Sequence, residues 1–336
     1  MNLNIIGPCT TQTSYGIVTL NLVKELAHDH NVSLFPIGQT EHHPYFPIHK
    51  ELERGKFPNR DNWCVRIFHQ HSLDLFCGKS VGMPIFELDR FTPQETHQMN
   101  SCEKLISCSK WAQELVPKLS HVVPLGVDLN LFKPSPTFNK KPVFLHIGKV
   151  EVRKRSKEIV DLFAEEFKDD DVELWLAWDN IFTGNEDWNR YAVQKLGNKV
   201  KIVPRMDYLQ VPKLIQAADA VISLSSAEGW NLPILEAMAC EKWTIATNCT
   251  GQTEFIDDSV HKVEVDEMEW AFDGVFFNGE VGKWYKIGDK QKAQFKQHLR
   301  SIYNHIQNGD VNHNARRRAK EFSWQESAKK LVACLN

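Results

Sequence analysis

The sequence predicts an α/β protein built from two doubly wound parallel sheets with crossover helices. Short apolar runs alternate with helical patterns in two successive series. A segment marked by prolines, from Pro124 to Pro142, separates the two series as a linker would. The chain has 336 residues, more than one hydrophobic core usually supports, so two domains of roughly 150 residues each are expected.

The elements of each series follow from its apolar pattern. The first series opens with a strand candidate at 4–6, which ends at Gly7-Pro8, and a helix is expected where apolar residues recur at helical spacing over 17–27. Further strand candidates in this series are 32–35, 64–68, 83–86 and 104–107, with a helix over 111–116. The second series contains strand candidates at 142–147, 172–177, 200–203, 220–224 and 244–246.

Composition limits the classes of function. A net charge of −3 and a pI near 6.5 argue against a protein dominated by binding to nucleic-acid phosphates. No apolar run approaches the roughly 20 residues of a membrane span, and the first residues lack the plan of a signal peptide. The eight cysteines are scattered without a Cys-x-x-Cys pair, as in a reducing compartment. These features predict a cytoplasmic protein.

The segment from Glu228 to Glu236 places two carboxylates eight residues apart around a predicted helix start. Asn231 suits the N-cap and Pro233 the first turn, so Glu228 is expected in the loop and Glu236 inside the helix. The first-turn N–H groups and the helix dipole favour an anion such as a diphosphate. Carboxylates only accept hydrogen bonds, so this pair suits the hydroxyls of sugars. Two solvated glutamates on an ordinary strand-loop-helix are the alternative interpretation.

This segment resembles that of a known family. The pair Glu228 and Glu236, with seven residues between them, matches retaining GT-B glycosyltransferases, and EGWNLPILEAMA is similar to the version in glycosyltransferase family 4, the glycosyl transferases group 1. The resemblance implies that Glu228 contacts the donor sugar and Glu236 the ribose of the nucleotide. It also implies that the backbone of four residues meets the diphosphate and sugar: Gly229, Trp230, Asn231 and Leu232.

The resemblance extends over nearly the whole chain. It implies a GT-B fold, with two Rossmann-like domains and an interdomain cleft. Residues 1–138 are expected to bind the acceptor and residues 139–321 the nucleotide sugar. The segment 123–128, Val-Pro-Leu-Gly-Val-Asp, is similar to the interdomain segment of the family. Phe322-Ser-Trp324 resembles the approach to its C-terminal helix, so a helix at about 322–336 is expected to pack back on the first domain.

A basic cluster follows the strand candidate at 142–147. Its four members are Lys149, Arg153, Lys154 and Arg155. Departure of a nucleoside diphosphate develops negative charge that fixed cations and a helix N-terminus can neutralise. The family has a glycine-arginine turn and then a lysine here, so Lys149 takes the arginine position and Lys154 the lysine position, with Arg153 as an alternative. Arg155 replaces the usual glycine, and a solvated basic loop is the other interpretation.

Two further positions bear on the resemblance, one that has a glycine and one where the family usually has a glycine. The loop up to Ser14-Tyr-Gly16 resembles the first loop of the family, in which Gly16 would allow close approach to the diphosphate. Glu241 stands where the family usually has a glycine after the helix that carries Glu236. Since a glutamate is less suited to a left-handed conformation, this turn is expected to differ.

Two histidines follow the strand candidate at 64–68. They lie where ligands bind in open parallel sheets, at the carboxyl end of the strand. Related enzymes carry a histidine at the end of this strand that points at the donor sugar, and His71 is the first candidate and His69 the second. A histidine that packs under a loop is the alternative for at least one of them.

Metal-independent chemistry is expected, and no cofactor besides the donor substrate. Asp169-Asp-Asp171 resembles an Asp-x-Asp metal motif but precedes a strand, so a charged turn is the better interpretation. The donor is expected to be a UDP-, GDP- or ADP-linked sugar. A glycan or small molecule is the default acceptor, since residues 1–140 carry 13 basic and 13 acidic side chains.

Three alternatives remain open from the sequence. A viral-type enzyme that glycosylates a base in DNA would share the donor site. A nucleotide-sugar epimerase shares the architecture and would need a group that removes a proton. A non-catalytic protein would bind the glycan or the nucleotide sugar without turnover.

Overall fold

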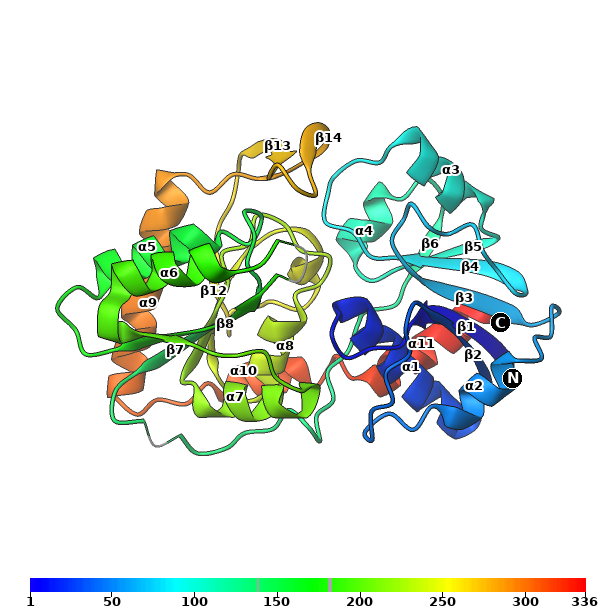
Figure 1. Cartoon of the computed structure of the whole chain (residues 1–336), viewed down its shortest axis with the longest axis horizontal. Coiled ribbons are helices and arrows are strands. Elements are labelled where there is room, and N and C mark those ends of the chain that lie inside the picture. The colour runs from blue at the N-terminus through cyan, green and yellow to red at the C-terminus, as the bar shows by residue number, and fades with distance from the viewer. Residues whose placement is uncertain (138, 181–182) are drawn as a thin grey trace. The chain divides into compact units, whose positions relative to one another are not determined.

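The computed structural model describes residues 1–137, 139–180 and 183–336. The chain divides into two compact units, Met1–Gly126 with Phe322–Asn336, and Val127–Glu321. Figure 1 shows a sheet flanked by helices in each unit. The sequence placed the domain boundary at residue 138, which lies outside the described residues. In the structure the second unit begins earlier, at Val127. Phe132 explains the difference, because its fully buried ring packs against Tyr208 of the second unit.

The first unit is built on a six-stranded parallel sheet with the order β2-β1-β3-β4-β5-β6. The order reverses beside β1, which is the switch point where such sheets bind ligands. Its strands are β1 (Asn2–Pro8), β2 (Asn31–Ile37), β3 (Trp63–Phe68), β4 (Lys79–Pro84), β5 (Lys104–Ser107) and β6 (Ser120–Val122). Its helices are α1 (Ser14–Asp29), α2 (His49–Gly55), α3 (Pro93–Ser101), α4 (Lys110–Leu115) and α11 (Trp324–Leu335).

The C-terminal helix α11 packs against α1 in the first unit. Gly126 makes this return possible, because a Cβ at this position would lie 2.3 Å from the backbone nitrogen of Trp324. The Ser323 side chain caps α11 by accepting a hydrogen bond from the backbone of Glu326. The glycine of the Val-Pro-Leu-Gly segment is therefore required by close packing of two backbones.

The second unit contains another six-stranded parallel sheet, with the order β12-β11-β10-β7-β8-β9, and a separate antiparallel hairpin, β13-β14. Its strands are β7 (Val143–Lys149), β8 (Glu173–Asp179), β9 (Val200–Ile202), β10 (Ala220–Ile222), β11 (Trp243–Thr247), β12 (His261–Val263), β13 (Met268–Phe272) and β14 (Asn278–Tyr285). Its α-helices are α5 (Ser156–Glu166), α6 (Glu186–Leu196), α7 (Val211–Ala217), α8 (Leu232–Ala239), α9 (Asp289–Gln307) and α10 (His313–Ala319). The short 3₁₀ helices are η1 (Gly197–Lys199), η2 (Tyr208–Gln210) and η3 (Thr250–Glu254).

A cluster of aromatic residues fills the core beneath the second sheet. Phe144 on β7 contacts Phe163 of α5 and Phe167 just beyond it, with ring centroids 5.6 and 5.3 Å apart. Strands of a parallel sheet are covered by helices on both faces, so their apolar runs are nearly continuous. The two parallel sheets with their crossover helices confirm the predicted fold class.

The turn after α8 does not differ in the way expected. Glu241 adopts a φ of +60°, the left-handed conformation that usually favours glycine. The carboxylate of Glu241 lies 3.3 Å from His313. The expectation of a changed turn was wrong, because a glutamate here keeps the conformation that ends the helix.

Candidate functional site

The glutamate pair lies around the start of α8, as the sequence predicted. Glu228 is in the loop after β10, and Glu236 is inside α8 with Pro233 in its first turn. Asn231 does occupy the N-cap position, but its side chain makes no capping bond. With a φ of +74°, it instead donates to Gln252 Oε1 at 2.8 Å and to Ser223 Oγ at 3.3 Å. The predicted capping role was wrong, and Asn231 stabilises the loop.

The 3₁₀ helix η3 holds the Glu228 loop in place, and the sequence analysis missed it. Thr250 Oγ1 accepts from the backbone of Glu228 at 2.9 Å, and the nitrogen of Gly251 donates to the carbonyl of Glu228 at 3.0 Å. A Cβ at Gly251 would lie 1.9 Å from the carbonyl oxygen of Gly229, so the two backbones touch. The available signal was Thr250-Gly251 shortly after β11, which ends at Thr247.

Glu228 is held between two cations from the basic cluster. Lys154 Nζ lies 2.6 Å from Glu228 Oε1, and Arg153 Nη1 lies 3.2 Å from Oε2. All three side chains are largely buried. Gly148 leaves room for this arrangement, because a Cβ there would meet the Lys154 side chain at 3.0 Å. The structure therefore brings together two sequence motifs that are about 75 residues apart.

These cations decide the charge state of Glu228. Burial alone would raise the pKa of its carboxyl group, but the attraction of Lys154 and Arg153 and hydrogen bonds from Lys154 and Ser225 outweigh burial. The pKa of Glu228 falls to about 2. Glu228 is thus ionised at neutral pH, with a cation beside each oxygen.

Glu236 has the opposite surroundings. It is as buried as Glu228, each with 6% of its surface exposed. Within the described part of the chain, no hydrogen bond or ion pair reaches its carboxyl group, and burial raises its pKa to about 8. A buried acceptor without a partner costs free energy, which a ligand with hydroxyl groups would recover.

The other cations differ in their exposure. Arg153 also binds Glu151, at 2.6 Å, and the carbonyl of Ala227. Lys149 is more exposed and lies 3.5 Å from Glu151, with its ammonium group 4.7 Å from the ring centroid of Phe276. The buried Arg153 therefore bridges the carboxylates of Glu151 and Glu228, while Lys149 lies at the exposed edge of the basic cluster.

Arg155 has a role that the sequence did not predict. It adopts a left-handed conformation, with φ 53° and ψ 37°, at the N-cap of α5, where the family usually has a glycine. This conformation costs a non-glycine residue about 1 kcal/mol or more. Arg155 Nε donates to Ser226 Oγ at 2.7 Å, and its Nη2 binds Glu269 of the hairpin. Arg155 therefore joins the α5 start, the Glu228 loop and the hairpin.

The remaining residues of the glutamate segment face inward. Trp230 is buried and packs against Phe255, with ring centroids 5.2 Å apart. Leu232 is also buried, at the start of α8. The side chains of Trp230 and Leu232 are therefore part of the core, and the expected backbone contacts of this segment stay a prediction.

Gly16 lies in the first turn of α1, in the first unit. A Cβ at Gly16 would lie 1.8 Å from the carbonyl oxygen of Thr10, so the glycine is required by the loop itself. Thr13 caps α1 by accepting from the Gly16 nitrogen at 3.2 Å. Glu41 binds the same loop through Thr10 and Thr11, at 2.7 to 2.9 Å. Internal packing thus explains the glycine.

The two histidines follow the carboxyl end of β3. His69 is partly buried, and its Nδ1 lies 2.9 Å from the hydroxyl of Tyr15. That hydroxyl donates to the carbonyl of Ile85 at 2.6 Å, so it must accept from His69. Neutral His69 therefore carries its proton on Nδ1 and presents Nε2 as an acceptor. Tyr15, at the start of α1, is a further residue that the sequence analysis missed.

His71 is more exposed than His69. Its Nδ1 lies 2.8 Å from the hydroxyl of Ser72, and its ring stacks on His69 with centroids 5.1 Å apart. The structure thus fixes the orientation of His69 through Tyr15 and Ile85, while His71 has only local contacts among those described.

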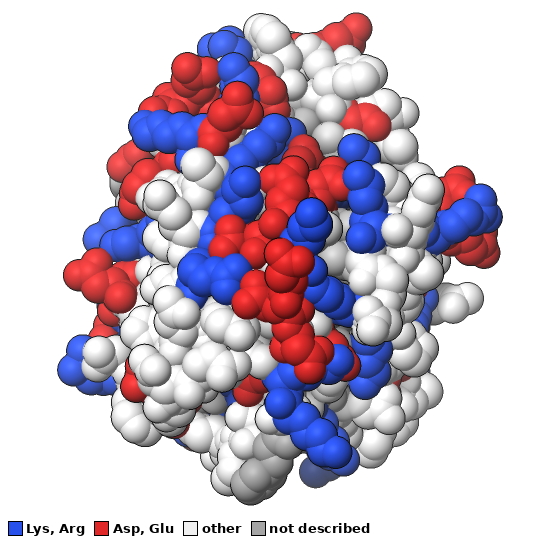
Figure 2. Space-filling view, turned by 90° about the vertical axis from the view of Figure 1, so that its left-hand side faces the viewer, with Lys and Arg blue, Asp and Glu red and all other residues white. Residues whose placement is uncertain are grey.

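The Asp169 to Asp171 run forms a charged turn between α5 and β8, as predicted. Asp170 binds Arg300 at 2.9 Å, and Asp171 binds Lys141 at 3.3 Å. Figure 2 shows basic and acidic side chains interleaved over this face of the molecule. Within residues 1–137, 139–180 and 183–336, no group of three or more His, Cys, Asp or Glu side chains is arranged to hold a metal ion.

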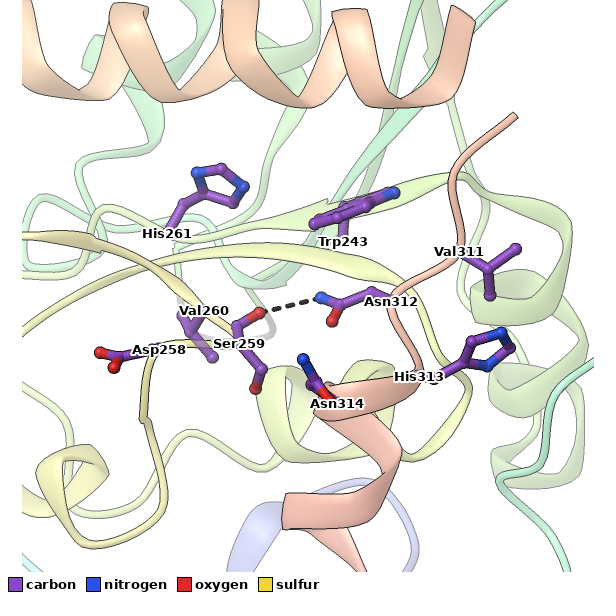
Figure 3. Close-up of a pocket in the computed structure, with 9 residues that line it drawn as sticks. All are labelled: Trp243, Asp258, Ser259, Val260, His261, Val311, Asn312, His313 and Asn314. Carbon is purple, nitrogen blue, oxygen red and sulfur yellow. Dashed lines mark hydrogen bonds between the residues drawn. The ribbon is translucent and has the colours of Figure 1, made fainter. Parts of the chain in front are cut away.

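A cavity of about 430 Å³ lies elsewhere in the second unit (Figure 3). It is lined by Trp243, Asp258, Ser259, Val260, His261, Val311, Asn312, His313 and Asn314. Asn312 donates to the carbonyl of Ser259 at 2.9 Å, and burial lowers the pKa of His261 to about 4. None of the predicted site residues lines this cavity, so the candidate donor site is defined by the glutamate pair.

Comparisons with known proteins concern the family and the fold of the chain. Residues 128–271 match the family model described as glycosyl transferases group 1, and this range contains the glutamate pair and the basic cluster. No curated protein sequence matches the chain. Of the helices in the described ranges, none is long and apolar enough to cross a membrane.

Solved structures resemble the whole chain. Sucrose-phosphate synthase from Thermosynechococcus elongatus has 15% identity and a TM-score of 0.71, over 99% of this chain and 98% of that chain. HepE from Anabaena in complex with UDP-glucose has 16% identity and a TM-score of 0.69, over 100% and 99%. A glycosyltransferase from Rickettsia africae has 15% identity and a TM-score of 0.67, over 99% and 97%.

These similarities confirm the GT-B fold and the resemblance to glycosyl transferases group 1. At this identity the solved structures establish the fold. The matched family segment, residues 128–271, is the finding that bears on activity.

Proposed function

We propose that this protein is a retaining glycosyltransferase that takes a sugar from a UDP-, GDP- or ADP-linked donor. The observation that carries the proposal is the pair of buried glutamates at the start of α8, one bound to two cations and the other without a partner among the described residues. HepE was solved with UDP-glucose, which favours a UDP-linked donor for this chain as well.

Glu236 is the proposed ribose contact. Its carboxyl group is buried without a hydrogen-bond donor in the described residues, and ribose hydroxyls are such donors. When those hydroxyls donate to it, the ionised form is stabilised and the group gives up its proton. Ribose binding would thus relieve the cost of burying Glu236.

The leaving diphosphate is the proposed ligand of Lys154 and Lys149. An ammonium group has three N–H donors, so the contact of Lys154 with Glu228 leaves two for phosphate oxygens. The N-terminus of α8, with the backbone of Gly229 and Leu232, adds N–H donors and a positive dipole. These groups would stabilise the charge of the departing diphosphate without a metal ion.

Glu228 is proposed to orient the donor sugar and not to attack it. A carboxylate with a pKa of about 2 and a cation beside each oxygen is a weak nucleophile. Its remaining lone pairs can accept from sugar hydroxyls. Retention would therefore proceed without a covalent intermediate on Glu228.

For the first unit we propose that His69 takes the role in turnover and that His71 is secondary. The sequence favoured His71, but the hydrogen bonds of Tyr15 fix the ring of His69 and its tautomer. A positioned ring contributes more to a reaction than one that must first be oriented. His69→Ala should then lower turnover more than His71→Ala does, and the reverse order would restore the original preference.

Thermal shift with UDP-, GDP-, ADP- and CMP-linked sugars tests the donor site, because a ligand of the folded state raises its melting temperature. We expect a shift with one nucleotide class and its loss in Glu236→Ala and Lys154→Ala, each of which should weaken binding by about 1 to 3 kcal/mol. If both variants bind as tightly as the parent, the donor site is elsewhere.

Product analysis tests the reaction. NMR of the glycoside should show the anomeric configuration of the donor, and activity should survive exhaustive chelation with EDTA. Loss of activity with EDTA, restored by manganese or magnesium, would contradict the metal-independent proposal. Conversion of the donor alone into an epimer would indicate an epimerase, and transfer only to DNA would indicate a base-modifying enzyme.

A further inference from the structure

The β13-β14 hairpin carries its apolar residues on the outside. Along β13, Glu269 and Ala271 face inward while Met268, Trp270 and Phe272 are exposed. The exposed fractions reach 50% for Trp270 and 62% for Phe272. A solvated strand usually has the opposite pattern, with polar residues facing water. Exposed apolar surface of this kind commonly marks a binding site.

The tip of the hairpin continues this surface. Val275 and Phe276 are exposed by 59% and 42%. We call Trp270, Phe272, Val275 and Phe276 the aromatic tip. Gly274 and Gly279, both with positive φ, flank the Phe272 ring, where added Cβ atoms would meet it at about 4 Å or less. Glycine is favoured at both positions because each has a positive φ.

The aromatic tip is held rigidly. Asp273 Oδ1 accepts hydrogen bonds from the backbone nitrogens of Val275, Phe276 and Phe277, at 2.8 to 2.9 Å. The nitrogen of Asp273 donates to the carbonyl of Phe277 at 3.0 Å. A tip fixed by four hydrogen bonds presents its side chains with little entropy left to lose on binding.

The hairpin is also joined to the candidate donor site. The inward-facing carboxylate of Glu269 binds Arg155 and accepts from Trp284 Nε1 at 3.1 Å. Tyr285 donates its backbone N–H to the carbonyl of Ser226, two residues before Glu228, at 3.0 Å. Lys149 lies over the ring of Phe276. The aromatic tip is therefore continuous with the residues that surround Glu228.

We propose that the aromatic tip is a further contact for the acceptor, through neutral sugar rings, in addition to the residues of the first unit that the resemblance implies; this inference rests on the proposed function. The C–H face of a hexose packs on an aromatic ring, while its hydroxyl edge bonds to polar neighbours, which here include Asn278 and Glu280. Residues Met268–Tyr285 contain three acidic side chains and one basic side chain. Lys149 and Arg155 contact the hairpin and bring its charges to three acidic and three basic side chains. This balance gives an anionic membrane or a nucleic acid no net positive charge to bind and suits an uncharged glycan.

Saturation-transfer NMR with four neutral probes tests the inference. The probes are maltohexaose, cellohexaose, mannohexaose and chitohexaose, each added to the full chain in the presence of UDP. We expect transfer to the ring C–H protons of at least one probe and a loss of at least fivefold in Phe272→Ser. Phe57→Ser is the matched control, because Phe57 is an exposed phenylalanine of the first unit, and it should leave the signal unchanged.

Several outcomes would overturn the inference. The inference fails if none of the four probes shows transfer, or if Phe272→Ser shows as much transfer as the parent. It also fails if the chain, in place of binding glycan, sediments with phosphatidylcholine and phosphatidylglycerol vesicles or forms a dimer in a way that depends on Phe272. Thermal shift with nucleotide sugars, measured on the same variants, separates the two proposals. If the parent binds nucleotide sugar and Phe272→Ser keeps glycan binding, only the acceptor inference fails; if no nucleotide sugar binds the parent, the proposed function fails.

Discussion

Two buried glutamates eight residues apart experience opposite surroundings in this protein. Glu228 has a cation beside each oxygen and a pKa of about 2, while Glu236 has no bonding partner in the described residues and a pKa of about 8. Their burial is equal, so the neighbours make the difference. On the proposed function, Glu228 is organised before any ligand arrives, whereas Glu236 gains its hydrogen-bond partners from one.

This difference suggests a division of roles in the candidate site. The ion pairs of Glu228 fix the side chains of Lys154 and Arg153. Under the proposed function, the groups for a reacting sugar and its diphosphate are then already in place. Glu236 carries a cost of burial that a ribose would remove. The predictions below test this comparison, from the largest effect to the smallest.

The largest effect on stability is expected for Glu228. Its low pKa means that ionised Glu228 stabilises the fold above about pH 4.5, and that this contribution is lost as the pH falls through 2. Glu228→Gln removes the charge at every pH and leaves Lys154 and Arg153 buried with less compensation. We expect the free energy of unfolding in urea at pH 7 to fall by about 3 kcal/mol. Asp187→Asn, which breaks an exposed pair with Arg190, should change nothing measurable and is the control.

A smaller effect with the opposite dependence on pH is expected for Glu236. Its pKa is raised by folding, so the stability of the apo protein is highest below about pH 4.5 and is lost as the pH rises through 8. Relative to Glu236→Gln, the parent should lose about 2.5 kcal/mol between pH 5 and pH 7. Urea unfolding of both proteins at pH 5, 6, 7 and 8 measures the difference. Parallel curves would show that Glu236 is not held protonated.

The smallest effect is expected for Tyr15. Tyr15→Phe removes the acceptor of the His69 Nδ1 proton, so the ring should populate both tautomers. We expect turnover to fall about tenfold, equivalent to one hydrogen bond of about 1.4 kcal/mol, with nucleotide binding unchanged. The ¹⁵N shifts of His69 report the tautomer directly. A variant with normal turnover and mixed tautomers would exclude this positioning role. Tyr45→Phe is a matched control, because the hydroxyl of Tyr45, in the same unit, accepts from Lys24 at 3.0 Å, whereas Nδ1 of His69 pairs with the hydroxyl of Tyr15.

The sequence predicted the regular parts of the molecule well. Five of the six strands of each sheet came from apolar runs, while β6 and β12 were not predicted, and the glutamate loop came from its proline and carboxylate spacing. The hairpin β13-β14 was missed because its apolar residues face outward, although Asp273-Gly274 between two apolar runs is a hairpin signal. Helix α2 was missed because a seven-residue helix has too little periodicity to recognise.

The sequence did not predict how the site residues are paired. The roles of Arg153 and Arg155 depend on partners far away along the chain, Glu228 and Glu269, and spacing within a motif contains no such information. The same holds for Tyr15, which meets His69 only because α1 and the end of β3 belong to one unit. The local sequence pattern identified the candidate residues, but only the tertiary structure shows which residues they contact.

The most direct test of the account is the proton balance of donor binding. Calorimetric titration at pH 7 with the nucleotide that binds, in buffers of different ionisation enthalpy, measures the protons released per ligand. With a pKa of about 8, Glu236 is mostly protonated in the apo protein, so a ribose that donates to it should release close to one proton. In Glu236→Gln the release should vanish and binding should weaken. Tight binding without proton release, unchanged in Glu236→Gln, would contradict the assignment of Glu236 as the ribose contact.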